Sequence, residues 1–410
     1  MRILYLHPKA WTGEYPLLRR LSQAGHDVSV LEEWRDMPGP PVRIADHFQE
    51  NEDSLPTYWY DPRRGWEKLL TWPADRFFKT AFEGRNLLHR MVVVCKAVRH
   101  FRPDALLCAE GFAYAIPAAF LRRLRLLTAP LVVSYIGGDI LDVPEAEVGK
   151  RRTLLTGWLI RQSLRGIDRF RPFSPLLRDA LLADGAAPDR IEIIPGHLVA
   201  EASALESVRR HKGEIRGRIR ARYGIADSAP LIVTLGGNQK GKGLHILADA
   251  WPSVLATLPG ARWLLCGPQS SWIAREVWPR LQTAGCAGSV VAAGRLEGLA
   301  VFEHLAAADL HVSPTLCDGG PMVNVEAAAV TTPSLTTDMA GNAFWLKQYD
   351  CGAVVPVGKS APLAAALTSL LTDTHRLASL REHCLEMSPL FSLEQVTRRL
   401  SGLLESAVSG

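Results

Sequence analysis

Short apolar runs alternate with helical segments along this sequence, and that alternation constrains the fold more than any other feature. Arg2–His7 is an apolar run suited to a buried strand, and residues 14–24 follow with leucines at helical spacing before Gly25. A second apolar run covers residues 28–31. Strand, helix and strand in this order predict a βαβ unit with parallel strands.

The first half of the chain continues this alternation up to a linker. Further strands are expected at residues 105–108 and 131–135, and residues 191–196 are interpreted as the last strand before the linker. Residues 34–85 break the rhythm, because they are rich in Trp, Tyr, Pro and Arg without clear periodicity. They are interpreted as an insertion above the sheet.

The pattern restarts after a basic helical stretch at residues 201–223. Strands are expected at residues 231–235, 263–266, 290–292, 310–313 and 334–337, and helices at residues 299–308, at 323–330 and from residue 244 onward. A length of 410 residues suits two domains of roughly 200 residues each. We therefore predict an α/β protein with two Rossmann-like, doubly wound domains, at residues 1–198 and 199–385, and an amphipathic tail helix within residues 386–410.

Composition excludes several classes of protein. Hydrophobic residues make up 47% of the chain and charged residues 22%, which is the balance of a soluble globular protein. The net charge of +5 and the pI near 8.8 are too mildly basic for a dedicated nucleic-acid binder. The seven cysteines lack metal-binding spacing, which indicates reduced thiols and no metal site.

The same composition bears on localisation. No apolar stretch reaches the roughly 20 residues that a membrane span needs, and the N-terminal apolar run is too short for a signal peptide. A cytoplasmic protein is therefore expected. Peripheral contact with the inner face of a membrane stays open.

The segment at residues 313–329 carries the chemistry. It runs from the end of an expected strand through a glycine-rich turn into a helix, and ligands of open α/β sheets bind at such strand ends. Glycines allow a close backbone approach, and the free N–H groups of a helix N-terminus favour an anion such as a diphosphate. Asp318 and Glu326 stand eight positions apart, and carboxylates accept hydrogen bonds from hydroxyl groups. A ribose and a sugar are natural partners for this pair.

This segment resembles the signature of the retaining GT-B glycosyltransferases of the family 4 type. The signature reads E-G-x-x-x-x-x-x-E followed by A, whereas this chain has Asp318-Gly319 and then Glu326-Ala327, so that only the first acid is shorter. Residues 305–314 and 331–338 echo the flanking family patterns, and the likeness covers residues 230–360. The resemblance implies a GT-B fold, in which two Rossmann-like domains face each other across a cleft and the tail helix crosses back to the N-terminal domain.

The resemblance also assigns roles to individual residues. It implies that Glu326 holds the nucleotide ribose and that Asp318 contacts hydroxyl groups of the donor sugar. The backbone that follows Asp318 would lie near the sugar and the phosphates. The resemblance therefore implies that Gly319, Gly320, Met322 and Val323 bind the donor. On the acceptor side, residues 7–13 resemble the family's glycine loop, and this points to Gly13.

A second family element supplies positive charge to the diphosphate. It reads G-R-x-x-x-x-K-G, and this chain has Gly236 and Lys242 in the matching places but Gly237 where the family has arginine. Compensation of the charge that develops on a leaving phosphate is usually a large catalytic term. We hypothesise that Lys240 or Arg295 replaces the missing cation.

Each donor-side assignment has a structural alternative. Asp318 would equally serve as the N-cap of the following helix, Glu326 as part of a solvated helix face, and Lys242 as an ordinary surface lysine beside a glycine. The basic stretch would be a solvated helix or a phosphate or membrane contact. It contains Arg209, Arg210, Lys212, Arg216, Arg218, Arg220 and Arg222.

The N-terminal half leaves similar alternatives open. Gly13 is an acceptor-loop glycine or a plain turn, His7 a strand-end histidine or a catalyst, and Asp139 a cleft residue or a structural turn. The aromatic and basic residues between Trp59 and Phe78 fit either a lipid headgroup region or a lid over the acceptor.

The resemblance implies a metal-independent hexosyltransferase without a cofactor. It would move a sugar from a nucleoside-diphosphate sugar to a hydroxyl acceptor, which would be a glycan, a lipid-linked molecule or a small molecule, with retention of anomeric configuration. The alternative is a non-catalytic protein of the same fold that binds nucleotide sugars. An NAD-dependent oxidoreductase is disfavoured, because no strand is followed by G-x-G-x-x-G and a later acid.

Overall fold

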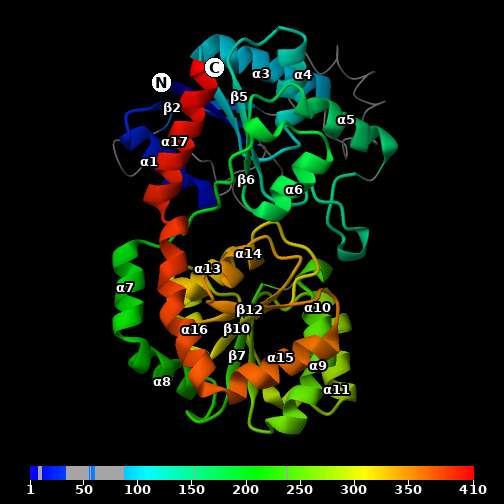
Figure 1. The fold of residues 1–410 in the computed structure, drawn as a ribbon, viewed down its shortest axis with the longest axis vertical. Helices are drawn as coiled ribbons and strands as arrows, with labels where there is room; N and C mark the ends of the chain where they lie inside the picture. Colours follow the sequence, from blue (N-terminus) through cyan, green and yellow to red (C-terminus); the bar gives the residue numbers. More distant parts are fainter. Residues whose placement is uncertain (8–11, 34–54, 56, 61–86, 152, 237–238) are drawn as a thin grey trace. The chain divides into compact units, whose positions relative to one another are not determined.

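The computed structural model describes residues 1–7, 12–33, 55, 57–60, 87–151, 153–236 and 239–410 (Figure 1). The chain forms two compact units. Unit 1 contains Met1–Asp142, Gly149–Pro195 and Leu393–Gly410, and unit 2 contains Val143–Val148 and Gly196–Ser392.

Unit 1 is built on a parallel six-stranded sheet with the strand order β3-β2-β1-β4-β5-β6. Its strands are β1 (Arg2–His7), β2 (Asp27–Glu33), β3 (Thr57–Tyr60), β4 (Ala105–Cys108), β5 (Leu131–Tyr135) and β6 (Arg169–Pro172). Its helices are α1 (Tyr15–Gln23), α3 (Leu87–Phe101), α4 (Ala115–Arg123), α5 (Leu154–Leu164), α6 (Pro175–Ala183) and α17 (Leu393–Ser409). The apolar stripe of α17 is buried against α1 and the sheet, so the last helix of the chain belongs to the core of unit 1.

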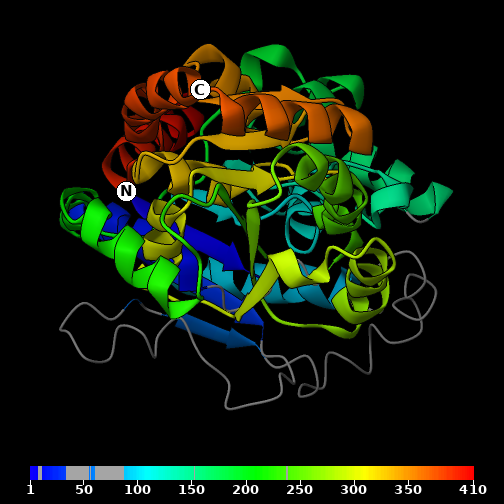
Figure 2. The same cartoon turned by 90° about the horizontal axis from the view of Figure 1, so that it is seen from below.

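Unit 2 repeats the architecture with the strand order β12-β11-β10-β7-β8-β9. Its strands are β7 (Leu231–Leu235), β8 (Arg262–Cys266), β9 (Val290–Gly294), β10 (Leu310–Ser313), β11 (Ser334–Thr337) and β12 (Gly352–Val355). Its helices are α7 (Ala202–Arg210), α8 (Lys212–Arg222), α9 (Leu244–Thr257), α10 (Ser271–Glu276), α11 (Trp278–Thr283), α12 (Leu299–Ala307), α13 (Met322–Ala329), α14 (Ala343–Gln348), α15 (Ser360–Thr372) and α16 (Thr374–Met387). The orange helix α15 packs on α9 and lies alongside the strands (Figure 2).

Two buried tryptophans centre the core of unit 2. The rings of Trp251 and Trp263 pack edge to face with their centroids 5.9 Å apart. Each indole N–H donates a hydrogen bond of 2.8 Å, to the hydroxyl of Ser289 and of Thr234 respectively. Both indole N–H groups are therefore hydrogen-bonded inside an apolar core.

The alternation of apolar runs predicted most of the sheet correctly. β1, β4, β5, β7, β10 and β11 have the predicted bounds. The predicted strand at residues 191–196 is wrong, because Ile191 makes only an isolated bridge to Phe170. The amides of Glu192 and Ile194 do bond β6, but Pro172 has no N–H to return a bond, so no ladder forms.

The interpretation of residues 34–85 as an insertion needs one correction. Thr57–Tyr60 is not above the sheet but forms β3, which pairs in parallel with β2 at the sheet edge. The rest of that region, apart from Leu55, and with it most of the aromatic and basic patch, lies outside the described residues.

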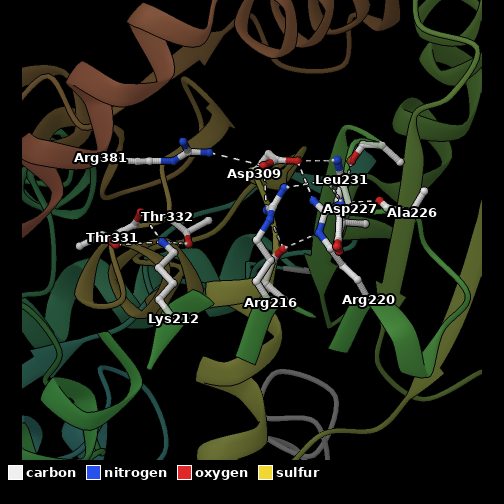
Figure 3. A network of polar contacts seen from close by, with 12 residues as sticks. Lys212, Arg216, Arg220, Ala226, Asp227, Leu231, Asp309, Thr331, Thr332 and Arg381 are labelled. Atoms are coloured by element: carbon white, nitrogen blue, oxygen red, sulfur yellow. Dashed lines mark hydrogen bonds and ion pairs between the residues drawn. The ribbon is translucent and has the colours of Figure 1, made fainter. Parts of the chain in front are cut away.

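The basic stretch at residues 201–223 forms two helices, and most of its cations are held inside unit 2. Arg220 is fully buried and pairs with Asp309 at 2.9 Å, and Arg216 reaches the same carboxylate at 2.9 Å (Figure 3). Asp309 also accepts a 2.8 Å hydrogen bond from the amide of Leu231 and lies 3.5 Å from Arg381. Both predicted alternatives are wrong for Arg220, because its side chain is buried and paired with Asp309. Arg216 is half-buried and paired with the same carboxylate, so it is not a freely solvated side chain.

Within the described ranges, no helix is both long and apolar enough to cross a membrane.

Candidate functional site

Three loops of unit 2 are joined where neighbouring strands end. They follow β7, β10 and β11, which are adjacent in the sheet. The carbonyl of Gly241 accepts hydrogen bonds from the Thr315 hydroxyl at 2.8 Å and from the Leu316 amide at 2.7 Å. The carbonyl of Asp318 accepts a 2.8 Å bond from the amide of Gly341. These bonds fix the loops to one another at the edge where open α/β sheets bind ligands.

One glycine makes this arrangement possible. Gly243 has a φ of 68°, and a Cβ added to it would lie 1.8 Å from the carbonyl oxygen of Pro314. Both the left-handed backbone and the close approach exclude a side chain. The loop after β7 therefore packs directly on the backbone of the loop after β10.

Asp318 and Lys242, which come from two of these loops, form an ion pair. The Lys242 ammonium lies 2.8 Å from one carboxylate oxygen, and the other oxygen accepts a 3.1 Å hydrogen bond from the amide of Gly320. The Asp318 side chain is 19% exposed and that of Lys242 is 38% exposed. The predicted sugar-binding and phosphate-binding groups are thus brought together, and they neutralise each other's charge.

Glu326 lies on α13, the helix that follows the loop of Asp318. Its side chain is half-buried, and no described residue donates a hydrogen bond or forms an ion pair with its carboxylate. Burial raises the pKa of Glu326 from its ordinary value of 4.5 to about 7. A pair of hydroxyl groups that donates to this carboxylate would replace the hydration that it has lost.

The first turn of α13 offers free backbone donors. Its N-cap is Pro321, whose side chain makes no capping bond, so the first N–H groups have no partner within the helix. Met322 and Val323 supply these groups, and their side chains are half-buried. A helix N-terminus with free N–H groups favours an anion, which is the chemistry predicted from the sequence.

Two asparagines that the sequence reasoning missed hold the N-terminus of α13. The Asn324 amide donates a 2.9 Å hydrogen bond to the side-chain oxygen of Asn342. The Asn342 amide donates a 2.6 Å bond to the carbonyl of Pro321. Both side chains are buried, and they connect the loop after β11 to α13.

The C-terminus of α13 is held by cations of the basic stretch. Arg209 donates a 2.9 Å hydrogen bond to the carbonyl of Ala329. The Lys212 ammonium lies 2.9 Å from the carbonyl of Val330 and 2.8 Å from both the carbonyl and the hydroxyl of Thr331 (Figure 3). Thr331 has a φ of 57°, which is unusual for a β-branched residue. Burial, together with the nearby Arg381, lowers the pKa of Lys212 from 10.5 to about 7.

The remaining predicted donor residues are distributed along this edge. Lys240 shares the short 3-10 turn Lys240–Lys242 with Lys242, and Gly236 directly follows β7 with a φ of 89°. Gly237 lies outside the described residues. Arg295 follows β9, the far edge strand, and is 75% exposed and paired with Glu297 at 3.0 Å.

The predicted acceptor-side residues belong to unit 1. The buried Asp139 carboxylate accepts 2.8 Å hydrogen bonds from the amides of Gly111 and Gly137. Burial raises its pKa, against the effect of these bonds. This geometry favours the structural-turn alternative for Asp139. Gly13 lies in the 3-10 turn Thr12–Glu14, beside the buried Glu14, which accepts a 3.0 Å bond from the Tyr5 hydroxyl.

The residues that the structure describes contain no group of three or more His, Cys, Asp or Glu side chains that could hold a metal ion.

Both units match known domain families. Residues 14–197 match the family described as glycosyl transferase 4-like domain, and residues 229–373 match the family described as glycosyl transferases group 1. Both halves of the chain belong to glycosyl transferase families. The second match contains all three loops and α13, so the candidate site lies within the matched domain.

Solved structures of similar fold cover the whole chain. A glycosyltransferase of Rickettsia africae has a TM-score of 0.75 at 11% identity and covers 99% of this chain and 98% of its own. HepE of Anabaena, solved in complex with UDP-glucose, has a TM-score of 0.74 at 16% identity and covers 99% of this chain and 100% of its own. The predicted GT-B fold is confirmed.

Curated relatives match over shorter stretches. The phosphatidyl-myo-inositol mannosyltransferase of Mycobacterium leprae is 30% identical over 135 residues, which are 32% of this chain and 34% of that protein. The D-inositol 3-phosphate glycosyltransferase of Rhodococcus erythropolis is 28% identical over 228 residues, which are 54% of this chain and 49% of that protein. The matched part of the chain thus spans a third to a half of the length of these relatives.

Proposed function

We propose that the chain transfers a hexosyl group from a nucleoside-diphosphate sugar to a hydroxyl acceptor, with retention of configuration and without a metal ion. The observation that carries this proposal is that Asp318, Lys242 and helix α13, which contains Glu326, lie together at the ends of adjacent strands. The structures of HepE in complex with UDP and with UDP-glucose support a nucleotide sugar as donor.

The donor is recognised through its hydroxyl groups and its charge. Glu326 accepts hydrogen bonds from the two ribose hydroxyls, which satisfy a half-buried carboxylate. The diphosphate lies at the N-terminus of α13, where the N–H groups of Met322 and Val323 point and the helix dipole favours negative charge. Gly319 allows the sugar and phosphates to approach the loop.

When the donor binds, the ion pair between Asp318 and Lys242 opens, and each side chain contacts a different part of the donor. Asp318 turns from Lys242 to hydroxyl groups of the sugar and orients it, and Lys242 turns to the diphosphate. In the reaction the bond between the anomeric carbon and the phosphate oxygen breaks, and the acceptor oxygen bonds that carbon on the same face. The acceptor proton passes to the leaving phosphate, whose negative charge Lys242 offsets.

The acceptor class follows less directly. Gly13 lies beside the buried Glu14 in unit 1, and we place the hydroxyl acceptor at that glycine loop. The Mycobacterium leprae and Rhodococcus erythropolis relatives are named for inositol-containing acceptors. A polyhydroxylated acceptor, whether free or lipid-linked, is therefore the first to test.

Titration calorimetry with UDP-, GDP-, ADP- and TDP-sugars tests the donor site. One donor is expected to bind wild-type protein, and Glu326→Gln is expected to weaken its binding at least about 10-fold, since a carboxylate that accepts from hydroxyls contributes about 1.5–3 kcal/mol. Glu386→Gln, an exposed substitution on α16, is the control and keeps wild-type affinity. Equal donor affinity in all three proteins contradicts the proposed site.

The position of Gly237 favours a second candidate, a nucleotide-sugar binder without turnover. Product formation from the bound donor separates the two functions. Turnover by the wild type supports the transferase. Donor binding without turnover, in the presence of a panel of polyol acceptors, together with turnover by Gly237→Arg, supports the binding protein, because that substitution restores the family cation.

A further inference from the structure

Helix α5 presents an exposed stripe that the donor site does not use. Leu154, Trp158, Arg161 and Arg165 are all exposed and are spaced by four, three and four residues, so they share one face of the helix. Leu154 is 93% exposed and Trp158 is 51% exposed. The opposite face is buried through Leu159, Ile160 and Leu164, so α5 is anchored in unit 1 while its outer face stays open.

The end of α4 extends this exposed face. Arg123, Leu124, Arg125 and Leu126 are consecutive and exposed, with Leu124 at 61% and Leu126 at 63%. The Arg123 guanidinium donates a 3.1 Å hydrogen bond to the carbonyl of Gln162 on α5. Gly166, just beyond α5, is so close to α4 that an added Cβ would lie 2.2 Å from the carbonyl of Ala119. The eight exposed residues therefore form one surface, which we call the α4–α5 surface.

This surface carries only positive charge. Neither residues 115–128 nor residues 150–167 contain Asp or Glu. Asp168, just before β6, pairs with Arg122 at 2.8 Å, and Asp184, just after α6, pairs with Arg151, so both of these carboxylates are already neutralised by other arginines. Within the described residues, Arg123, Arg125, Arg161 and Arg165 form no ion pair with a carboxylate.

We propose that the α4–α5 surface docks unit 1 on an anionic phospholipid bilayer. Exposed Trp and Leu side chains enter the boundary between headgroups and acyl chains, and arginines beside them bind lipid phosphates. The surface combines four apolar side chains with four arginines, which is the composition that such docking needs. A second copy of the chain does not fit it, because a symmetric contact would place these arginines against each other without a carboxylate.

Co-sedimentation of the full chain with vesicles tests this proposal. The vesicles are pure phosphatidylcholine or a 70:30 mixture of phosphatidylcholine and phosphatidylglycerol. Wild-type protein is expected to bind the anionic vesicles more strongly and to lose this binding as NaCl is raised from 0.1 to 0.5 M. Because each arginine near an anionic surface contributes about fivefold, Arg161→Gln/Arg165→Gln is expected to lower the partition coefficient about 30-fold.

A charge-matched control distinguishes binding through the α4–α5 surface from an effect of the net charge of the protein. Arg178→Gln/Arg398→Gln removes two arginines of the same unit whose side chains are 43% and 69% exposed and pair with Asp179 and Glu394, and it is expected to bind like the wild type. Trp158→Ala is expected to lose roughly fivefold in partition at either salt concentration. Unchanged thermal unfolding of each variant excludes misfolding.

Three results would overturn the proposal. The wild type fails to bind anionic vesicles, the α5 variants bind as well as the wild type, or the control loses as much binding as Arg161→Gln/Arg165→Gln. A concentration-dependent dimer in analytical ultracentrifugation that Trp158→Ala abolishes would instead assign the surface to a second copy. The experiment uses no donor, so its outcome is independent of the proposed transfer reaction.

Discussion

Lys212, which donates hydrogen bonds to the carbonyls at the C-terminus of α13, predicts a pH dependence of folding stability. The pKa of Lys212 is about 7 in the folded chain, lowered from its ordinary value of 10.5 chiefly by burial. Between pH 7 and 10.5 the unfolded chain therefore holds a proton that the folded chain has released. The free energy of unfolding therefore rises with pH throughout that window. Below pH 7 both states hold the proton, so Lys212 no longer makes the free energy of unfolding depend on pH.

The perturbation that isolates this effect is Lys212→Met, which keeps the apolar stem and removes the titrating amine. Each pH unit well above the folded pKa contributes about 1.4 kcal/mol, and less close to it, so from pH 7 to pH 9 the wild type is expected to gain about 2.3 kcal/mol relative to the variant. The neutral amine can still donate hydrogen bonds to the carbonyls of Val330 and Thr331, so these contacts persist above pH 7.

Urea unfolding of unit 2 at half-unit steps from pH 6 to pH 9, followed by tryptophan fluorescence, measures this difference. Trp251 and Trp263 in its core report on the transition. Lys359→Met, an exposed lysine just before α15, is the matched control. If the wild-type and Lys212→Met curves run parallel across this range, the assignment of a lowered pKa to a buried Lys212 is refuted.

Three further predictions concern the candidate donor site. Because burial raises the pKa of Glu326 to about 7, donor affinity is expected to fall about tenfold per pH unit below pH 7, and calorimetry should find this dependence absent in Glu326→Gln. Gly243→Ala is expected to destabilise the chain by more than about 3 kcal/mol in urea melts, through both φ and the clash with Pro314, whereas Gly285→Ala, with the same φ of 68° and open space, should lose only about 1 kcal/mol. Lys242→Met is expected to lower the transfer rate about 100-fold, and an unchanged single-turnover rate would remove Lys242 from the reaction.

β6 shows why a strand can be missed by a search for apolar runs. Predicted strands such as β5 and β7 are mostly apolar and mostly buried. β6 reads Arg-Phe-Arg-Pro, and its Arg171 is only 1% exposed, with its guanidinium donating to the carbonyls of Ile194 and Pro195. A buried arginine is satisfied by partners more than twenty residues away, and no local pattern records them.

The contacts within the candidate donor site could be predicted only in part. Asp318, Glu326 and Lys242 stand in a family motif, and the structure brings Asp318 and Lys242 into contact. That they form an ion pair could not be predicted, because 76 positions separate them and spacing carries no signal at that range. The asparagines that hold α13 were missed for the same reason, since only the folded loop after β11 brings Asn342 to Asn324.

Two arginine-rich stretches show how far composition alone can mislead. The stretch at residues 201–223 has the denser positive charge, yet Arg216 and Arg220 converge on Asp309, a carboxylate that lies 89 positions beyond Arg220 and is delivered by the start of β10. The α4–α5 surface has fewer arginines and attracts less notice in the sequence, but no carboxylate reaches Arg161 or Arg165 in the described structure. A basic segment is available to an anionic partner only where the fold brings it no carboxylate. The folded position of acidic residues therefore selects the α4–α5 surface, and excludes Arg216 and Arg220 of α8, as the place to look for membrane contact.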